Sequence, residues 1–528
     1  MARKLLQLLL LALFLSCTAI LITPALSDDG TADDDIHRWC HRTPFPEPCK
    51  YYITNSPAHS VPRNSTEFER LMVEISLAQA VDAWTEARKM KPSCRSEQEM
   101  AAVGDCLRLY DHIVLQLNQT LKPETECTQF DAQTWLSTAL TDLETCRASA
   151  VEQGVLDFLS PLMSKNVSEL ISDALAVNYE GKPEPKRKYA DGFPSWVSGH
   201  DRELLQTLAS PKRANLVVAQ DGSGHFRTIR QAVAAAARRS GGRRFVVYVK
   251  SGIYGENIEI GAEMSNIMLV GDGIRKTIIT GSRSVGAGTT SFNSATVGIM
   301  GNGFIARDIT FRNTAGPNKY QAVALRSGSD QSVFYRCGIM GYQDTLFVHS
   351  QRQFYKQCYI YGTIDIIFGN AAVVFQNCMI YVRRPMPGQV NVITAQGRSD
   401  PNQNTGISIH NSRVMAARDL KPVLPSFRTY LGRPWRQYSR TVYIKTFLDS
   451  LVHPAGWLEW ENTNFAIGTV YYGEYGNFGP GSSARWRVKW PGYHRIANPR
   501  EAARFTVGNF IAGRTWLPAT GVPFTVGL

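Results

Sequence analysis

Two kinds of hydrophobic spacing divide this chain. From about residue 35 to residue 180, apolar positions recur every three or four residues, as in EFERLMVEISLAQAVDAWTEARKM and CLRLYDHIVLQLNQTL. This is the period of amphipathic α-helices. Several such stretches follow one another, so the pattern predicts an all-α four-helix bundle.

Beyond about residue 214 the apolar residues fall in short β-branched runs that Gly and Asn interrupt, such as RRFVVYVKSGIY, SVFYRCGIMG and AVVFQNCMIYV. Runs of this kind at regular intervals, without long helices between them, predict an all-β right-handed parallel β-helix. One helix, TIRQAVAAAARRS, is expected to cap its N-terminal end. The polar, proline-containing residues 181–213 indicate a linker between the two domains that is open to proteolysis.

Polar residues repeat within the β-domain at the interval of one solenoid coil. Asp344 in GYQDTL and Asp365 in GTIDIIFGN are 21 residues apart, and Gln321 precedes Gln343 by 22. A coil takes about 20–25 residues and neighbouring parallel strands lie about 4.8 Å apart, so residues one coil apart stack on one face. We therefore expect two carboxylates and two amides to converge in one small patch.

Cysteines follow the same interval in the β-domain, where Cys337, Cys358 and Cys378 are separated by 21 and 20 residues. Spacing alone does not fix which cysteines pair. The helical domain offers three candidate pairs: Cys40 with Cys49, Cys106 with Cys146, and Cys94 with Cys127.

Charge separates the same two parts of the chain. Residues 28–200 contain 17 Lys and Arg against 27 Asp and Glu, a net of −10, whereas residues 201–528 contain 38 against 18, a net of +20. Opposite signs predict that the two parts attract each other, and the basic part by itself suits a polyanion. Nucleic acid and acidic polysaccharide are both polyanions, so charge does not choose between them.

The N-terminus predicts export from the cell. A basic start, an apolar run from Leu5 to Ile22 and a small-residue cleavage site ending at Ser27 are typical of a secretory signal peptide over residues 1–27. The apolar run is also long enough to serve as a signal anchor. Secretion agrees with disulfide formation and with three N-glycosylation sequons, at Asn64, Asn118 and Asn166.

Six motifs give the β-domain a specific resemblance. In chain order they are GIYGEN at 252–257, QAVALR at 321–326, GYQDTL at 341–346, GTIDIIFGNA at 362–371, LGRPWR at 431–436 and GWLEW at 456–460. Together they resemble the plant pectin methylesterases (pectinesterases). The acidic helical domain is similar to the pectin methylesterase inhibitor domain that such proteins carry as a pro-region.

This resemblance implies four segments: a signal peptide at 1–27, an inhibitor-like helical pro-domain at 28–180, a linker or processing region at 181–213, and a catalytic β-helix at 214–528. It implies a secreted, monomeric carboxylic ester hydrolase that removes methyl groups from homogalacturonan in the cell wall, without cofactor or metal. The implied partners are pectin, the chain's own pro-domain and separate inhibitor proteins, and not nucleic acid.

The resemblance also implies a role for each residue of the site. Asp365 would attack the C6 carbonyl of a methyl-esterified galacturonate, and Asp344 would protonate the departing methanol and then activate water. Arg433 would pair with Asp365 and keep it ionised. Gln321 and Gln343 would donate hydrogen bonds to the oxyanion. The implied substrate contacts are Gln321, Arg433, Trp435 and Ser291.

Further implications concern a disulfide and three departures from the common family pattern. The family pattern pairs Cys358 with Cys378 and leaves Cys337 free. Ser291 stands where a Thr is common, Phe347 where a Tyr is common and Ile366 where a Phe is common, and all three changes leave the catalytic groups intact. In the linker, DRELLQ at 201–206 replaces a dibasic processing signal, which puts cleavage at that point in doubt.

Other function classes suit parts of the pattern. Two carboxylates about 5 Å apart would also fit a retaining glycosidase that cuts the pectin backbone, but two glutamines and an Arg directed at one Asp suit acyl transfer better. A calcium-dependent lyase would need several clustered acids. A binding or inhibitor protein would not need the complete set of site residues. Product analysis on methylated pectin separates these classes.

Overall fold

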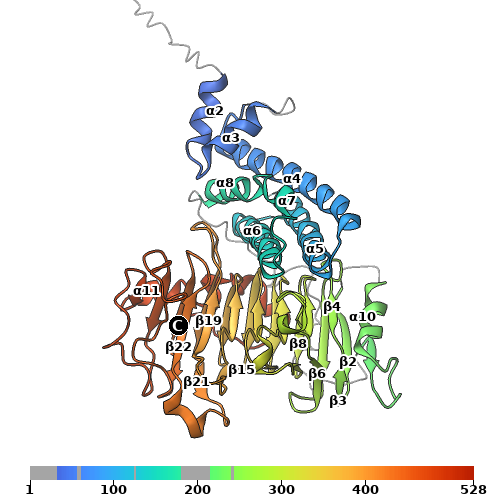
Figure 1. The fold of residues 1–528 in the computed structure, drawn as a ribbon, viewed down its shortest axis with the longest axis vertical. Helices are drawn as coiled ribbons and strands as arrows, with labels where there is room; N and C mark the ends of the chain where they lie inside the picture. Colours follow the sequence, from blue (N-terminus) through green and yellow to red (C-terminus); the bar gives the residue numbers. More distant parts are fainter. Residues whose placement is uncertain (1–31, 56–60, 124–126, 180–213, 239–242) are drawn as a thin grey trace, which may run out of the picture.

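The computed structural model of the chain describes residues 32–55, 61–123, 127–179, 214–238 and 243–528, and they form a helical domain seated on a β-domain (Figure 1). The predicted signal segment 1–27 and linker 181–213 lie outside the described residues. No described helix is both long and apolar enough to cross a membrane.

The helical domain is the four-helix bundle that the spacing predicted. Its long helices are α4 (Ser65–Met90), α5 (Glu97–Thr120), α6 (Gln129–Glu152) and α8 (Val167–Tyr179), and its short helices are α2 (Ala32–Cys40), α3 (Pro46–Thr54) and α7 (Ser160–Met163). The first three long helices begin at side-chain caps. Asn64 accepts a hydrogen bond from the Glu67 backbone, and Ser96 and Thr128 form capping boxes at α5 and α6.

Two of the candidate disulfides of the helical domain are present. Cys40 pairs with Cys49 between α2 and α3, and Cys106 pairs with Cys146 between α5 and α6. The third candidate pair is not formed, because Cys94 keeps a free thiol. The bundle core is therefore cross-linked between the two helices that lie nearest the β-domain.

The β-domain is a parallel β-helix, as predicted, whose strands form three sheets. The eleven-strand sheet contains β1 (Leu216–Val218), β2 (Phe245–Val249), β5 (Ile267–Gly271), β8 (Ile305–Arg307), β11 (Ser332–Tyr335), β14 (Arg352–Lys356), β17 (Ala372–Gln376), β20 (Gly406–His410), β23 (Arg440–Ile444), β25 (Tyr471–Tyr475) and β26 (Tyr493–Arg495).

The other two sheets complete each coil. The eight-strand sheet contains β3 (Gly252–Gly255), β6 (Thr277–Gly281), β9 (Thr310–Asn313), β12 (Gly338–Met340), β15 (Tyr359–Gly362), β18 (Met379–Val382), β21 (Arg413–Ala416) and β24 (Phe447–Leu448). The seven-strand sheet contains β4 (Ile258–Ile260), β7 (Val297–Ile299), β10 (Leu325–Ser327), β13 (Leu346–Val348), β16 (Ile367–Gly369), β19 (Asn391–Gln396) and β22 (Thr429–Pro434).

Helices close the β-domain. The predicted capping helix is α10 (Ile229–Ala237), which contacts β1, β2 and β4. The Glu256 carboxylate accepts hydrogen bonds from the backbone N–H groups of Ile229 and Arg230 at 2.9 Å each, so it satisfies the first turn of that helix. Near the C-terminus, α11 (Pro499–Ala503) and α12 (Val507–Phe510) pack against the eleven-strand sheet.

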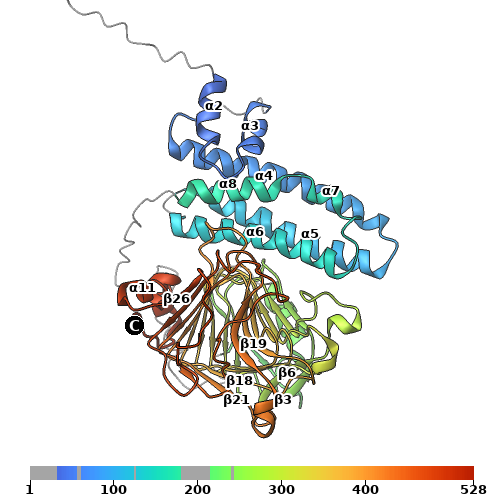
Figure 2. The ribbon, with the colours of Figure 1, turned by 60° about the vertical axis from the view of Figure 1, so that its left-hand side comes forward.

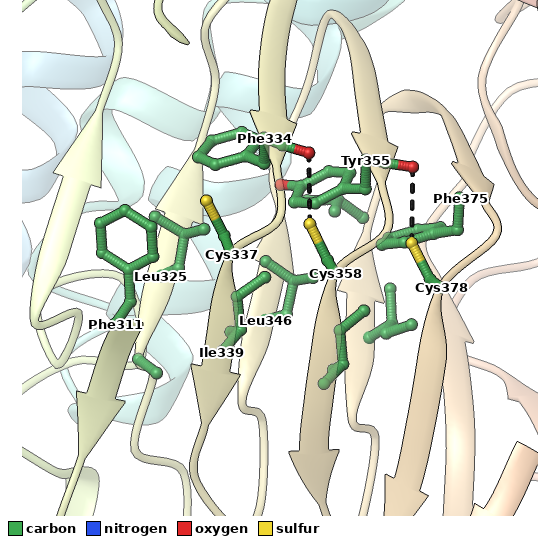
Figure 3. Close-up of a cluster of buried hydrophobic side chains, with 14 of the residues drawn as sticks. Phe311, Leu325, Phe334, Cys337, Ile339, Leu346, Tyr355, Cys358, Phe375 and Cys378 are labelled. Carbon is green, nitrogen blue, oxygen red and sulfur yellow. Dashed lines mark hydrogen bonds between the residues drawn. The ribbon is translucent and has the colours of Figure 1, made fainter. Parts of the chain in front are cut away.

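The interior of the β-helix is built from side chains that stack from coil to coil (Figure 3). Phe334, Tyr355 and Phe375 stack with ring centroids 4.6 Å apart at each step. The side chains at equivalent positions of neighbouring coils point the same way. A residue type that repeats once per coil therefore forms a continuous column of stacked side chains.

The three cysteines of the β-domain form such a column, and the Cys358–Cys378 disulfide implied by the resemblance is wrong for this structure. Cys337, Cys358 and Cys378 are buried free thiols. Figure 3 shows two of these thiols contacting a carbonyl oxygen: Cys358 Sγ lies 3.2 Å from the Phe334 oxygen, and Cys378 Sγ lies 3.4 Å from the Tyr355 oxygen. The sulfurs of Cys358 and Cys378 therefore donate to the backbone of the preceding coil and form no disulfide with each other.

The bundle lies across the outer face of the seven-strand sheet (Figures 1 and 2). One apolar cluster joins the bundle core to outward-facing side chains of that sheet and its loops. The residues that the β-domain contributes to this cluster are Phe292, Ala295, Val323, Phe347, Phe368 and Ala395.

Candidate active site

The coil interval brings the two aspartates together as predicted. Asp344 lies two residues before Leu346 of β13 and Asp365 lies two residues before Ile367 of β16, and these two strand residues are register partners. The Asp344 backbone N–H donates to the Ile364 carbonyl oxygen at 2.9 Å, which ties the two turns to each other. The two aspartates therefore occupy equivalent places on neighbouring coils.

Both aspartates adopt an unusual backbone conformation. The φ angles are 59° at Asp344 and 49° at Asp365, in the left-handed region. Aspartate tolerates this region better than most residues, and strained conformations of this kind concentrate at functional sites. Each tight turn holds its carboxylate next to the start of a strand of the seven-strand sheet, β13 for Asp344 and β16 for Asp365.

Asp365 is held by a two-point ion pair with Arg433 of β22. The Arg433 Nε donates to Asp365 Oδ1 at 2.9 Å and Nη2 donates to Oδ2 at 2.5 Å. Burial lowers the pKa of Arg433, but the charge and hydrogen bonds of Asp365 outweigh it and raise that pKa above its ordinary value. The guanidinium also lies 4.5 Å from the ring centroid of Trp460. These contacts fix the direction of the Asp365 carboxylate.

Asp344 has a different environment. It is 7% exposed, and its carboxylate makes no hydrogen bond with the described residues. Its pKa is raised well above the ordinary value, first by burial and then by the charge of Asp365, while Arg433 acts in the opposite direction. One carboxyl of the pair is therefore held by a guanidinium, whereas burial and the neighbouring carboxylate shift the other toward its protonated form.

All of the site residues that the sequence indicated line one cavity of about 340 Å³. They are Gln321, Gln343, Asp344, Asp365, Arg433, Trp435 and Ser291. In the described part of the chain, no group of three or more His, Cys, Asp and Glu side chains is placed to hold a metal ion.

One wall of the cavity is aromatic. Phe347 and Phe368, on neighbouring strands, stack with centroids 4.3 Å apart, and the Trp435 ring stands edge-on at 5.9 Å from Phe368. Phe347 and Ile366 were singled out in the sequence as departures from the family pattern. Phe347 lines the cavity, whereas Ile366 is fully buried in the β-helix core.

Helix α6 of the bundle forms the opposite wall. Thr145, Ala148, Ser149 and Glu152 line the cavity together with the catalytic-domain residues. The Glu152 carboxylate accepts hydrogen bonds from the Ser291 backbone N–H at 2.7 Å and from the Ser291 hydroxyl at 2.5 Å. Burial raises the pKa of Glu152, while the Ser291 hydrogen bonds act in the opposite direction. The Glu152 carboxylate of the bundle is thus hydrogen-bonded to Ser291, which is one of the implied substrate contacts.

Buried polar contacts hold the bundle in this position. Arg352 of β14 donates to Asp131 of α6 at 2.7 Å and to Asp330 at 2.5 Å. Burial raises the pKa of Asp131, but Arg352 and the cap hydrogen bonds with Thr128 outweigh it and lower that pKa. The hydroxyl of Thr145 lies 2.9 Å from Nε2 of His349. The predicted attraction between an acidic bundle and a basic β-domain is therefore realised in specific pairs.

Sequence reasoning gave no role to two cavity residues that contact the predicted site residues directly. Trp460 lies in the motif GWLEW, so the motif signalled its importance without giving a role. Glu152 carried no sequence signal, because a Glu in an amphipathic helix is ordinarily solvent-exposed. Its place depends on how the bundle docks.

Comparison with known proteins covers both domains. Residues 215–514 match the family model "Pectinesterase", and residues 34–177 match the model "Plant invertase/pectin methylesterase inhibitor". Pectinesterase 2 from Citrus sinensis is 57% identical over 518 residues, which is 98% of this chain and 100% of that protein. A probable pectinesterase/pectinesterase inhibitor 17 from Arabidopsis thaliana is 55% identical over 520 residues, 98% of this chain and 99% of that protein.

Solved structures resemble the β-domain. The pectin methylesterase from carrot is 55% identical, with a TM-score of 0.59, and covers 61% of this chain and 100% of its own length. The pectin methylesterase from Aspergillus niger is 30% identical, with a TM-score of 0.51, over 59% of this chain and 97% of its own.

Proposed function

The chain belongs to the pectinesterase family of carboxylic ester hydrolases, and we propose that it demethylesterifies cell-wall homogalacturonan through an Asp365 nucleophile. The observation that carries the mechanism is the asymmetry of the two carboxyls. Asp365 is clamped by Arg433 through two hydrogen bonds, whereas Asp344 is buried without such a partner.

In the first half of the reaction, Asp365 Oδ attacks the C6 carbonyl carbon of the galacturonate methyl ester. The carbonyl oxygen becomes an oxyanion, and the side-chain amides of Gln321 and Gln343 donate to it. As the intermediate collapses, the bond from C6 to the methoxy oxygen breaks and Asp344 gives its proton to that oxygen. Methanol leaves, and C6 remains bonded to Asp365 as an acyl-enzyme.

In the second half, Asp344 is a carboxylate and takes a proton from water. The hydroxide attacks C6, and the bond from C6 to Asp365 breaks. The galacturonate leaves as a free acid, while Asp344 is protonated again and Asp365 is again ionised beside Arg433. Every proton that moves is accounted for by Asp344, so no further acid or base is needed.

The variant Asp365→Asn tests the nucleophile. It keeps the shape of the side chain and removes the attacking charge, so we expect methanol release to fall by at least about 10³-fold with folding unchanged. Methanol and reducing ends should be measured together on methylated pectin. Methanol without new reducing ends supports the esterase, and substantial methanol release by the variant would refute the covalent step.

We also infer that the bundle inhibits the enzyme until the linker is cut. Glu152 and its neighbours on α6 line the cavity of Asp344 and Asp365, so a polymer cannot enter while the bundle is docked. The uncut protein should therefore be less active than the fragment that begins near Ala214. The solved carrot structure, whose whole length matches 61% of this chain, supports the choice of such a fragment. Equal activities of the two forms would exclude this inhibition.

The proposal includes export and processing. The pro-domain is assigned to residues 28–180, the linker to 181–213 and the catalytic domain to 214–528. The two disulfides and the exposed side chains of the sequon residues Asn64 and Asn118 support a secreted, glycosylated protein in the cell wall. Sequencing the N-terminus of the secreted protein would locate the cleavage after residue 27 and any cut in the linker.

A further inference from the structure

A second groove lies on the β-helix away from the active-site cavity. It occupies about 820 Å³ over the outer face of the eight-strand sheet, and none of its lining residues belongs to the bundle or to the catalytic set. Figures 1 and 2 show that strands β3, β6, β18 and β21 of this sheet lie on the side of the molecule opposite the bundle. Among the residues that the structure describes, the docked bundle therefore covers the active site and leaves this groove uncovered.

The floor of the groove carries a row of apolar and aromatic side chains. Met340 and Tyr361 line it and are register partners on β12 and β15, and Tyr381, the register partner of Tyr361 on β18, continues the row beyond the groove lining. The rings of Tyr361 and Tyr381 stack with centroids 4.8 Å apart and planes 15° apart. Tyr342 adds a third ring beside them. Half-buried tyrosines of this kind offer an apolar face together with a hydroxyl, which suits the C–H faces and hydroxyls of a sugar chain.

The rim of the groove is basic. Arg312, Arg383 and Arg418 line it, against a single acid, Asp419. Arg312 donates through Nε to Thr280 at 3.2 Å, and neither Arg312 nor Arg418 forms an ion pair with any residue that the structure describes. Their charges are therefore available to a ligand.

Arg383 contacts both the aromatic and the acidic residues of the groove. Its guanidinium lies 3.7 Å from the Tyr342 ring centroid, and it donates to the Gly341 carbonyl at 3.0 Å and to the Tyr342 hydroxyl at 2.6 Å. It also lies 3.4 Å from Asp419, so the one acid of the rim is already paired. The groove consequently presents a fixed aromatic and cationic surface without a free carboxylate, which suits binding and not hydrolysis.

We propose that this groove binds de-esterified galacturonan, the polyanionic product of the enzyme, independently of the active site. Charge favours this occupant, because free uronate carboxylates pair with Arg312 and Arg418 whereas methyl esters carry no charge. The tyrosine rings supply flat apolar faces against which the sugar rings of the polymer can stack. The choice of polymer rests on the proposed function, since that reaction produces it. The uncut protein is then held on pectate before its active site is exposed.

The test uses the uncut full-length chain, whose active site is covered. Affinity electrophoresis or retention on polygalacturonate should be measured for the double variant Arg312→Gln/Tyr361→Ala. We expect its affinity to fall at least about tenfold, since the variant loses both an ion pair to the uronate and a ring that stacks on the sugar. Retention on highly methylated pectin should be weak for every form.

A matched control removes one charge and one aromatic ring elsewhere. Arg485→Gln/Trp486→Ala changes a solvent-exposed Arg–Trp pair, whose partners lie 5.2 Å apart and outside the groove, and should leave retention unchanged. The proposal is overturned if the groove variant binds like the parent or if the control loses affinity equally. It is also overturned if single-stranded RNA displaces the protein from polygalacturonate as well as an oligogalacturonate does.

Methanol release by the linker-cut forms separates this proposal from the catalytic one. The groove variant should hydrolyse short methylated oligogalacturonates at the parent rate, because the active site is untouched. If no form releases methanol, the proposed function fails while the binding result still decides the groove. Unchanged melting temperatures for both double variants confirm that the fold is intact.

Discussion

Two aspartates of identical chemistry are given opposite roles by their neighbours. Asp365 faces a bidentate guanidinium, and Asp344 is buried beside that same anion. A left-handed backbone at both positions, with φ of 49° and 59°, adds strain that only the surrounding turns can hold. Activity at this site therefore depends on arrangements that lower the stability of the folded chain.

The variant Asp344→Asn tests that trade-off at the level of one residue. Burial raises the pKa of Asp344 above its ordinary value of 3.8, so the folded protein binds more protons than the unfolded chain as the pH rises above that value. The stability of the parent then falls with rising pH, and an uncharged Asn does not share the loss. We expect the variant to be nearly inactive and to gain stability relative to the parent as the pH rises above about 4.

Thermal unfolding of both proteins across this pH range checks the expectation. Asp419→Asn, a change at an exposed carboxyl, serves as the control and should show no such gain. A constant difference between Asp344→Asn and the parent at every pH would contradict a buried charge at Asp344.

At the scale of elements, docking places α6 so that one of its carboxylates faces the active site. Burial raises the pKa of Glu152 from its ordinary value of 4.5. The Glu152 carboxyl therefore binds a proton more tightly when the bundle is docked than when it is undocked. Other charges nearby are Asp105 and Asp344, which both repel the Glu152 anion. Docking should consequently weaken as the pH rises above about 4.5.

We expect the uncut protein to be more strongly inhibited at pH 5 than at pH 7.5, relative to the linker-cut enzyme at the same pH. In Glu152→Gln this dependence should flatten, because the amide keeps hydrogen-bonding capacity without titrating. Initial rates of methanol release measure it. Asp157→Asn, an exposed acid of the same domain, should behave like the parent; identical pH profiles for Glu152→Gln and the parent would disprove the role of Glu152.

The cysteine column gives a second prediction at this scale. Burial first, and then hydrogen bonds with its neighbours Cys337 and Cys378, raises the pKa of Cys358 well above its ordinary value, so the native Cys358 thiol should resist alkylation. After denaturation without a reductant, iodoacetamide should label Cys337, Cys358 and Cys378. Peptide mapping that finds Cys358 linked to Cys378 would restore the pairing implied by the family resemblance.

At the scale of the whole molecule, charge is distributed so that an acidic domain covers a basic one. Residues 201–528 carry a net charge of +20, and each ester that is hydrolysed adds a carboxylate to the polymer. A basic enzyme surface should therefore retain product-rich chains, and salt screens such attraction over about 8–10 Å.

We expect methanol release by the linker-cut enzyme from partly de-esterified pectin to rise at moderate salt, as retained product is released, and to fall at high salt. Fully methylated pectin, which is neutral, should show little of this response. Initial rates on both substrates across a salt series measure it. The same salt response on both substrates would mean that the basic charge plays no part in holding the polymer.

Much of the molecule could be predicted from local pattern and period. Helical spacing indicated the bundle, and the interval from Asp344 to Asp365 indicated both a β-helix and a shared site, because one coil of a solenoid converts sequence distance directly into stacking. The motif resemblance added Arg433, Trp435 and Ser291, all of which line the cavity.

The remaining features depend on tertiary structure, for a physical reason. The coil interval places Cys358 beside Cys378 but does not set the direction of each Sγ, and in the folded column the thiols face carbonyl oxygens. The contact of Glu152 with Ser291 joins residues 139 positions apart and exists only because the bundle docks on the seven-strand sheet. Short-range periodicity is thus determined by the sequence itself, whereas side-chain direction and domain docking are decided by packing among distant residues.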